Sequence, residues 1–204
     1  VYGDALRLGL AAPDTERASR QNDRLMARYR APHHRLVLLG ARALVATQQG
    51  RSDDANRLLR DAEQLERRGP TPPGGRPRVT GQVRAAVALA AGEPETALRA
   101  LGGRAPQRDP GTGLLDSRLL AARALIGVGR LAEARRALLS LEQDAGARLA
   151  APVPFVRSLY YLGALARGAG DAERARSYFR RFVDSWGNGS LDRDQVQDAE
   201  AFLR

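Results

Sequence analysis

The residue types that most often carry enzyme chemistry are scarce in this chain. It contains no Cys, and its two histidines, His33 and His34, are adjacent. Neighbours on a helix point about 100 degrees apart, so this pair cannot clamp one metal ion there, and we expect it at a helix start or on the surface. The Gly-Thr-Gly at 111–113 has no preceding strand and no following Lys, unlike a phosphate-binding loop. We therefore predict no catalytic residue and no cofactor.

The nearest match to a metal site is a loop near the C-terminus. Asp184, Asn188 and Asp192 fit positions of the calcium-binding helix-loop-helix pattern. Trp186 stands where another oxygen ligand is needed, and Gln195 replaces the bidentate Glu. We expect a chain reversal with Trp186 packed beneath it rather than a calcium site, and we predict no metal ligands.

Arginine is the other feature with chemical potential. The chain has 204 residues, with 33 Arg, no Lys, 23 acidic residues and a net charge of +10. Five consecutive segments each carry between +1 and +3, so no basic stripe dominates the sequence. Acidic neighbours at helical spacing, such as Glu63 and Arg67, are expected to pair part of this charge. The absence of Lys is typical of a GC-rich coding bias.

The composition leaves the compartment open. No apolar run approaches the roughly 20 residues of a membrane-spanning helix, so no membrane span is predicted. A chain without Cys fits either an oxidising or a reducing compartment. Because the first residue is Val1 and no signal pattern follows it, we expect a processed product or a fragment.

The elements that would position these residues follow from an internal repeat. Four segments share a Gly, an Ala five residues later, and a Leu or Phe four residues after the Ala. The sets are Gly50, Ala55 and Leu59; Gly92, Ala97 and Leu101; Gly129, Ala134 and Leu138; and Gly170, Ala175 and Phe179. A Gly in the left-handed conformation ends one helix, and the small Ala lets the next helix pack closely against it. This repeated pattern predicts four helix hairpins.

This repeated pattern of Gly, Ala and Leu or Phe resembles the tetratricopeptide repeat. In the fourth copy, Leu162 and Gly163 lie in the middle of the first helix, Gly170 at the turn, and Phe182 near the end of the second helix. The resemblance covers roughly residues 36–187 and implies an all-α solenoid. We expect a partial hairpin in the helical segment 1–35, four hairpins in 36–187 and a capping helix in 188–204.

The flanking and connecting segments are predicted as well. Residues 14–30 form a helical pattern with Asp14 as its N-cap, and residues 191–203 form the capping helix. Val196, Ala199, Phe202 and Leu203 share one stripe of that capping helix. Three stretches rich in Pro and Gly, at 69–78, 102–113 and 146–154, are expected to be loops between hairpins.

The resemblance also carries a functional expectation. The last repeat and the residues after it are similar to the C-terminal repeat regions of bacterial signalling proteins, among them kinases, cyclases and transcriptional regulators. This implies a non-catalytic scaffold for a protein or peptide partner, an acidic one given the Arg and Tyr on the first helices. The exposed concave positions expected to contact it are Gln48, Gln82, Asp116, Arg123, Arg157, Tyr160 and Arg167. Two alternatives stay open: a nucleic-acid-binding or regulatory repeat domain, and a structural subunit of a larger complex or filament.

Overall fold

The computed structural model describes residues 15–68, 79–103, 116–150, 152–186 and 192–204. Every regular element in these ranges is an α-helix, which confirms the all-α fold class for them. The helices are α2 (Thr15–Arg28), α3 (Pro32–Gln48), α4 (Ser52–Arg68), α5 (Val79–Ala90), α6 (Pro94–Ala100), α7 (Ser117–Gly127), α8 (Leu131–Glu142), α9 (Ala145–Ala150), α10 (Pro152–Gly168), α11 (Ala172–Trp186) and α12 (Arg193–Leu203). None of them is long and apolar enough to cross a membrane.

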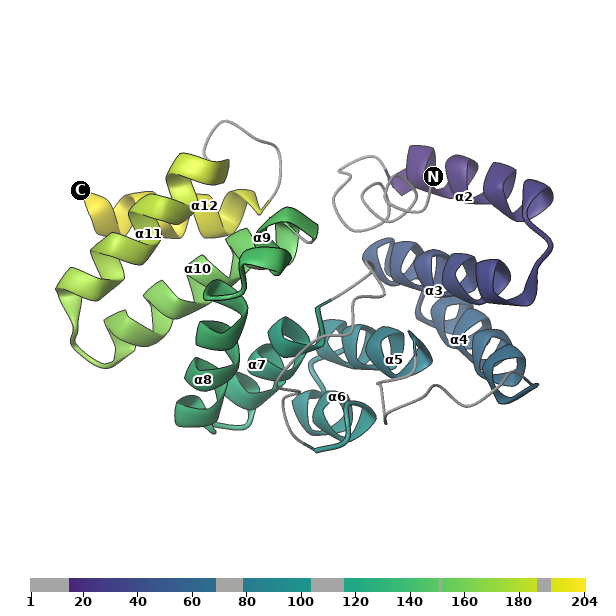
Figure 1. Ribbon diagram of the computed structural model, residues 1–204, viewed down its shortest axis with the longest axis horizontal. Helices are drawn as coiled ribbons and strands as arrows, with labels where there is room; N and C mark the ends of the chain where they lie inside the picture. Colours follow the sequence, from purple (N-terminus) through teal and green to yellow (C-terminus); the bar gives the residue numbers. More distant parts are fainter. Residues whose placement is uncertain (1–14, 69–78, 104–115, 151, 187–191) are drawn as a thin grey trace.

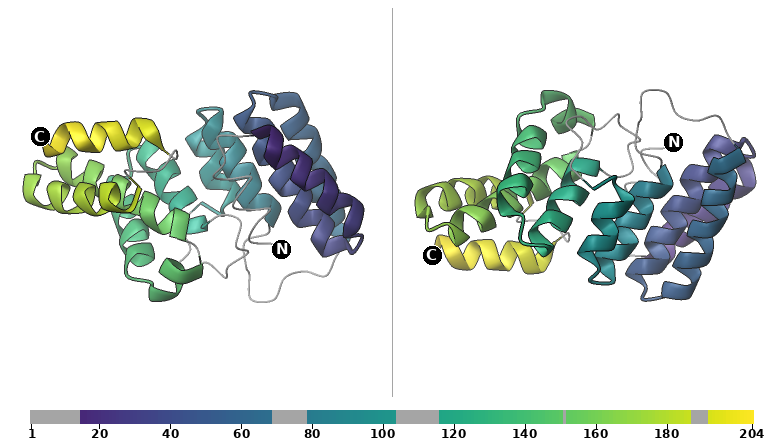
Figure 2. Two further views of the ribbon diagram at one scale, coloured as in Figure 1. Left: turned by 90° about the horizontal axis from the view of Figure 1, so that it is seen from above. Right: turned by 90° about the horizontal axis from the view of Figure 1, so that it is seen from below.

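Most of the helices pack in consecutive pairs. We refer to α3–α4, α5–α6, α7–α8 and α10–α11 as the first to fourth hairpins. They follow one another along the long axis of the molecule, from α2 at one end to α12 at the other (Figures 1 and 2). The first helix of each later hairpin also packs against the hairpin before it, so the pairs form one continuous stack.

The same turn closes all four hairpins. Gly50, Gly92, Gly129 and Gly170 have φ angles of 71, 74, 77 and 77°, in the left-handed region that a Cβ disfavours. In the fourth turn the Gly170 N–H donates to the Arg167 carbonyl at 3.1 Å, and the Asp171 N–H donates to the Ala166 carbonyl at 3.0 Å. The other three turns repeat this pair of bonds, which is the Schellman motif. The predicted role of the four glycines as helix terminators is confirmed.

The repeated Ala and Leu or Phe positions form the core. Ala55, Ala97, Ala134 and Ala175 are all fully buried, and the residue four places after each is at most 9% exposed. Apolar clusters cross the hairpin boundaries, and one extends from Ala85 of α5 to Leu162 of α10. A single hairpin could not bury such a face alone, so the stability of each pair depends on its neighbours.

The flanking helices occupy the predicted ranges. α2 lies within residues 14–30, although Asp14 itself is outside the described residues. In α12, Val196 and Ala199 are buried, and Phe202 and Leu203 pack against the same cluster as α10 and α11. The predicted apolar stripe of the capping helix is therefore confirmed.

One predicted loop is wrong. Residues 146–154 contain the end of α9 and the start of α10 rather than an irregular connection. The Asp144 carboxylate accepts a hydrogen bond from the Ala147 N–H at 3.1 Å, which stabilises the first turn of α9. Pro152 and Pro154 lie in the first turn of α10, where a missing N–H has no helical partner to lose. The predicted loop 69–78 and residues 104–113 of the loop predicted at 102–113 lie outside the described residues.

Candidate partner-binding site

The residues of the fourth hairpin that were predicted to contact a partner instead bind the C-terminal segment of the same chain. Arg157 donates two hydrogen bonds to the Asp192 carboxylate, at 2.8 and 2.9 Å. The Tyr160 hydroxyl donates to Asp198 at 2.9 Å, and Arg167 donates to the other oxygen of Asp198 at 3.0 Å. Two aspartates of the C-terminal segment thus bind these three residues: Asp192 binds Arg157, and Asp198 binds Tyr160 and Arg167.

The charges at this contact are mutually stabilised. The hydrogen bond from Arg167 lowers the pKa of Asp198, and the Tyr160 hydroxyl adds to this effect. Burial, reinforced by the same carboxylate, raises the pKa of Tyr160 to about 12. The hydrogen bond to Asp198 raises the pKa of Arg167. Asp198 is therefore an ionised acceptor shared by two donors of α10.

Asp192 acts as a second anchor for α12. Its carboxylate also accepts a hydrogen bond from Trp186 Nε1 at 2.9 Å, whereas the predicted chain reversal above Trp186 lies outside the described residues. Its backbone has a φ of 50°, a left-handed conformation immediately before the first residue of α12. Asn188 of the calcium-like pattern lies outside the described residues, and no group of three or more metal-binding side chains occurs within them.

Arg123 differs from the other predicted arginines. Its guanidinium lies 6.0 Å from the ring centre of Tyr161, a cation–π contact between the third and fourth hairpins. In the described part of the chain it forms no ion pair, and its side chain is half-buried. Among the expected groove residues, Arg123 therefore retains a charge that no described carboxylate neutralises.

Two residues that were predicted to be exposed partner contacts, Gln82 and Asp116, are buried, so that prediction is wrong for them. Gln82 is fully buried and donates from Nε2 to Ser117 Oγ at 2.5 Å, across the boundary between the second and third hairpins. Asp116 is 5% exposed and caps α7 by accepting from the backbone N–H groups of Arg118 and Leu119. Gln82 is therefore buried by its contact with the next hairpin, and Asp116 by its role at the start of α7. The side chain of Gln48 lies outside the described residues.

The polar cluster around Arg118 was missed from the sequence. This side chain is 3% exposed and pairs with Asp116 at 2.7 Å and with Asp144 at 2.9 Å. The hydrogen bond from Arg118 is the main cause of a lowered pKa at Asp144. Asp116 and Arg118 are two residues apart at a helix start, which is a usable signal for a cap. Their pairing with Asp144 joins residues that no local spacing connects.

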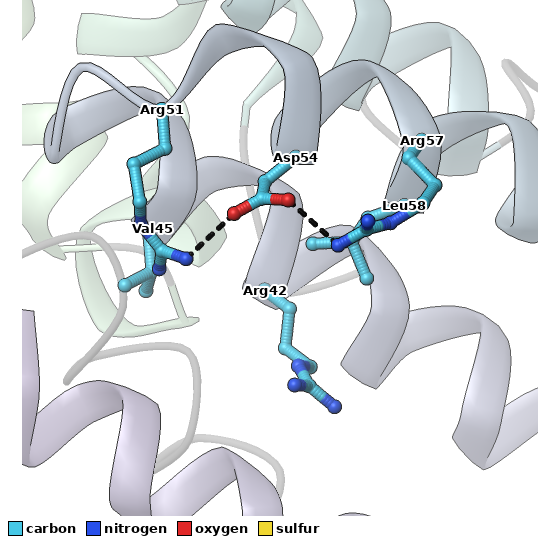
Figure 3. Close-up of a pocket in the computed structure, with 6 residues that line it drawn as sticks. All are labelled: Arg42, Val45, Arg51, Asp54, Arg57 and Leu58. Atoms are coloured by element: carbon cyan, nitrogen blue, oxygen red, sulfur yellow. Dashed lines mark hydrogen bonds and ion pairs between the residues drawn. The ribbon is translucent and has the colours of Figure 1, made fainter.

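A second missed feature is a small cationic depression on the first hairpin. Figure 3 shows Arg51 and Arg57 on either side of the Asp54 carboxylate, with hydrogen bonds of 2.8 and 2.6 Å. Arg42 of α3 also lines this depression, although its guanidinium points away from the Asp54 carboxylate in Figure 3, and Val45 and Leu58 complete a cavity of about 90 Å³. We call this feature the arginine hollow: Arg42, Val45, Arg51, Asp54, Arg57 and Leu58. The charged residues are visible in the sequence, but the sequence does not show that residues of α3 and of the α4 region line one cavity.

A larger cavity, of about 340 Å³, lies between the first and second hairpins. Leu59, Val87 and Ala88 contribute its apolar wall, while Arg84 and Glu93 bring opposite charges to it. Arg84 is paired with Glu63 of α4, so Glu63 does not use its expected helical neighbour Arg67. This ion pair joins the two hairpins.

Comparison of the chain with protein-family models, with curated proteins and with solved structures finds no match.

Proposed function

We propose that this chain is a non-catalytic scaffold of tetratricopeptide-like hairpins that binds a partner protein. The observation that carries the proposal is the equivalence of the four hairpins: each ends its first helix in the same Schellman turn and buries the same Ala. Stacked equivalent units present an extended surface rather than a single enclosed active site. The resemblance of the repeated sequence pattern to the tetratricopeptide repeat supports a protein-binding role for the scaffold.

The partner surface assigned by this proposal is centred on the third hairpin. On α10, Arg157, Tyr160 and Arg167 are bound to α12, so a partner would first have to displace a well-packed helix. Arg123 carries no such bond and borders Tyr161, so it offers both a charge and an aromatic surface. An acidic partner segment fits this pair.

The test begins with capture of binding proteins from the source cells, followed by calorimetric titration of a purified partner. We expect Arg123→Ala to weaken binding by about tenfold, the effect of losing one charge-assisted contact. Arg135→Ala, an exposed change on α8, is the matched control and should leave affinity unchanged. Equal affinities of wild type and Arg123→Ala would reject the assigned surface. A chain that forms large assemblies on its own by light scattering would instead favour a structural subunit.

One observation favours the nucleic-acid alternative. Arg57, Arg99 and Arg136 each follow their turn Gly by seven residues, and all three are exposed on second helices. A row of equivalent cations along a stack matches a regularly spaced polyanion. If it binds phosphates, log affinity for duplex DNA should fall with log salt at a slope of about −3, and Arg99→Ala with Arg136→Ala should reduce that slope by about 2. No binding at low salt would exclude this alternative.

A further inference from the structure

The arginine hollow holds more positive charge than its carboxylates neutralise. Arg42, Arg51 and Arg57 line it, whereas Asp54 is the acidic residue of its wall. Arg42 also lies 3.2 Å from Asp23 of α2, which is not among the lining residues. Three guanidinium groups against two carboxylates leave one net positive charge. We propose that the arginine hollow binds a dianionic phosphate group, either as inorganic phosphate or as a phosphate monoester.

The hollow has hydrogen-bond donors to offer such a group. A guanidinium carries five N–H donors in a planar fork suited to phosphate oxygens. Within the described chain, Arg57 makes one hydrogen bond, to Asp54, and Arg42 makes one contact, to Asp23. Arg51 is more fully used, since it donates to both Gln49 and Asp54. Arg42 and Arg57 are therefore the main donors for a ligand.

The size and floor of the hollow favour a single compact anion. A cavity of about 90 Å³ is far smaller than the roughly 300–1,000 Å³ that hold drug-sized ligands. Val45, which is 2% exposed, and the half-buried Leu58 give it an apolar floor. Charges beside such a floor are less screened than in open water, which strengthens their attraction for an anion. A phosphate group fits this combination better than a nucleoside or a peptide segment.

The second hairpin supplies an internal comparison. One repeat further along the chain, Arg42, Arg51, Asp54 and Arg57 correspond to Arg84, Glu93, Thr96 and Arg99. There Glu93 replaces an Arg, and Arg84 is paired with Glu63. The equivalent place therefore carries no cationic excess. This contrast assigns anion binding to the first hairpin and provides a matched control.

Substitution of Asp54 distinguishes phosphate binding from a purely structural ion-pair network, because the two predict opposite effects on phosphate affinity. Its carboxylate already occupies one donor on Arg51 and one on Arg57, so an incoming phosphate competes with it and is repelled by it. Asp54→Asn removes that charge while preserving the shape of the side chain. It should strengthen phosphate binding. A purely structural ion-pair network predicts the opposite, a weaker fold and no gain in binding.

The test is a titration of the isotope-labelled full chain with sodium phosphate, followed through the arginine Nε–Hε resonances by NMR. We expect saturable shifts at Arg57 and Arg42, about tenfold weaker binding in the Arg42→Ala, Arg57→Ala double variant, and at least about threefold tighter binding in Asp54→Asn. The Arg84→Ala, Arg99→Ala double variant should bind as wild type does. Unchanged circular dichroism and melting temperature show that each variant is folded.

A second arm separates the two sources of the group. A capped phosphoserine peptide that binds more tightly than inorganic phosphate identifies a monoester on a partner, while the reverse order identifies free phosphate. Either result supports the proposal, provided that the unphosphorylated peptide does not bind. The proposal is overturned if neither probe saturates, if Asp54→Asn weakens binding, or if the control double variant loses as much affinity as the hollow variant.

Discussion

Gly163 of α10 and Phe179 of α11 are in such close contact that a Cβ atom added to the glycine would lie 2.7 Å from ring carbons Cδ1 and Cε1. In the other hairpins the two equivalent places hold Ala and Leu: Ala43 with Leu59, Ala85 with Leu101, and Ala122 with Leu138. The fourth hairpin thus combines a larger residue on one helix with a smaller residue on the other. Size compensation keeps the separation of the two helices compatible with the same turn.

Gly163→Ala is expected to destabilise the protein by about 1–2 kcal/mol, because overpacking costs about 1–3 kcal/mol and the helix propensity of Ala returns up to about 1 kcal/mol. Urea unfolding measures the loss. Combining it with Phe179→Leu recreates the pairing of the other hairpins, so the double variant should lose less than the sum of the two single variants. Gly168→Ala, with nothing within 4 Å of its added Cβ, is the control and should not destabilise. Additive losses would contradict the size compensation.

Arg118→Ala is expected to cost about 3 kcal/mol or more, because it leaves the carboxylate of Asp116 buried without its counter-ion. Thermal and urea unfolding check this. Arg130→Ala removes an exposed ion pair with Glu133 and serves as the comparison, with little change expected. Similar losses in the two variants would show that burial of the Arg118 cluster does not set its contribution.

Stability should fall at high pH through Tyr160. Its pKa is raised to about 12 in the folded chain, against about 10 for an unfolded tyrosine, so its contribution is complete below pH about 10 and is lost as the pH rises through about 12. The difference in unfolding free energy between wild type and Tyr160→Phe should therefore shrink across that interval. In an Asp198→Asn background the dependence should be weaker, because the hydrogen-bonded charge is gone. A difference that stays constant from pH 8 to 12 would contradict the assignment.

Asp192→Asn should loosen α12 without unfolding the hairpins. The change removes the charge that Arg157 binds, while Asn tolerates the left-handed backbone at this position. Trp186, the only Trp in the chain, donates to this carboxylate, so its fluorescence should shift. Hydrogen exchange in α12 should accelerate. Asp194→Asn, in the exposed first turn of the same helix, is the control, and an equal effect there would argue against a specific anchor.

Much of the local structure followed from the sequence because its causes are local. A left-handed Gly, an Ala five residues later and a 3.6-residue apolar period act within one turn and two helices, and they placed the four hairpin turns and the apolar stripe of α12. Where a local signal was misread, as at Pro152, the error came from treating Pro as a loop residue rather than as a helix start. The tetratricopeptide likeness and the protein-binding role are proposals built on these turns.

The candidate site depended on contacts between residues far apart in the chain. The sequence predicted Arg157, Tyr160 and Arg167 as partner contacts, but in the structure they bind aspartates that lie 31 to 38 residues further along the chain. No period or motif links those positions, since only the packing of α12 brings them together.

The sequence by itself determined the four hairpin turns, the apolar stripe of α12 and which small residues lie between paired helices, but not α9. Only the tertiary structure decided which polar side chains are free, because that depends on what the neighbouring hairpin covers. Gln82 and Asp116 are buried, three residues predicted as partner contacts bind Asp192 and Asp198, and Arg123 has no ion pair among the described residues. The tertiary structure also places Arg42 of α3 and Arg57 of α4 in the lining of the arginine hollow. Counting charges along the chain does not reveal this arrangement.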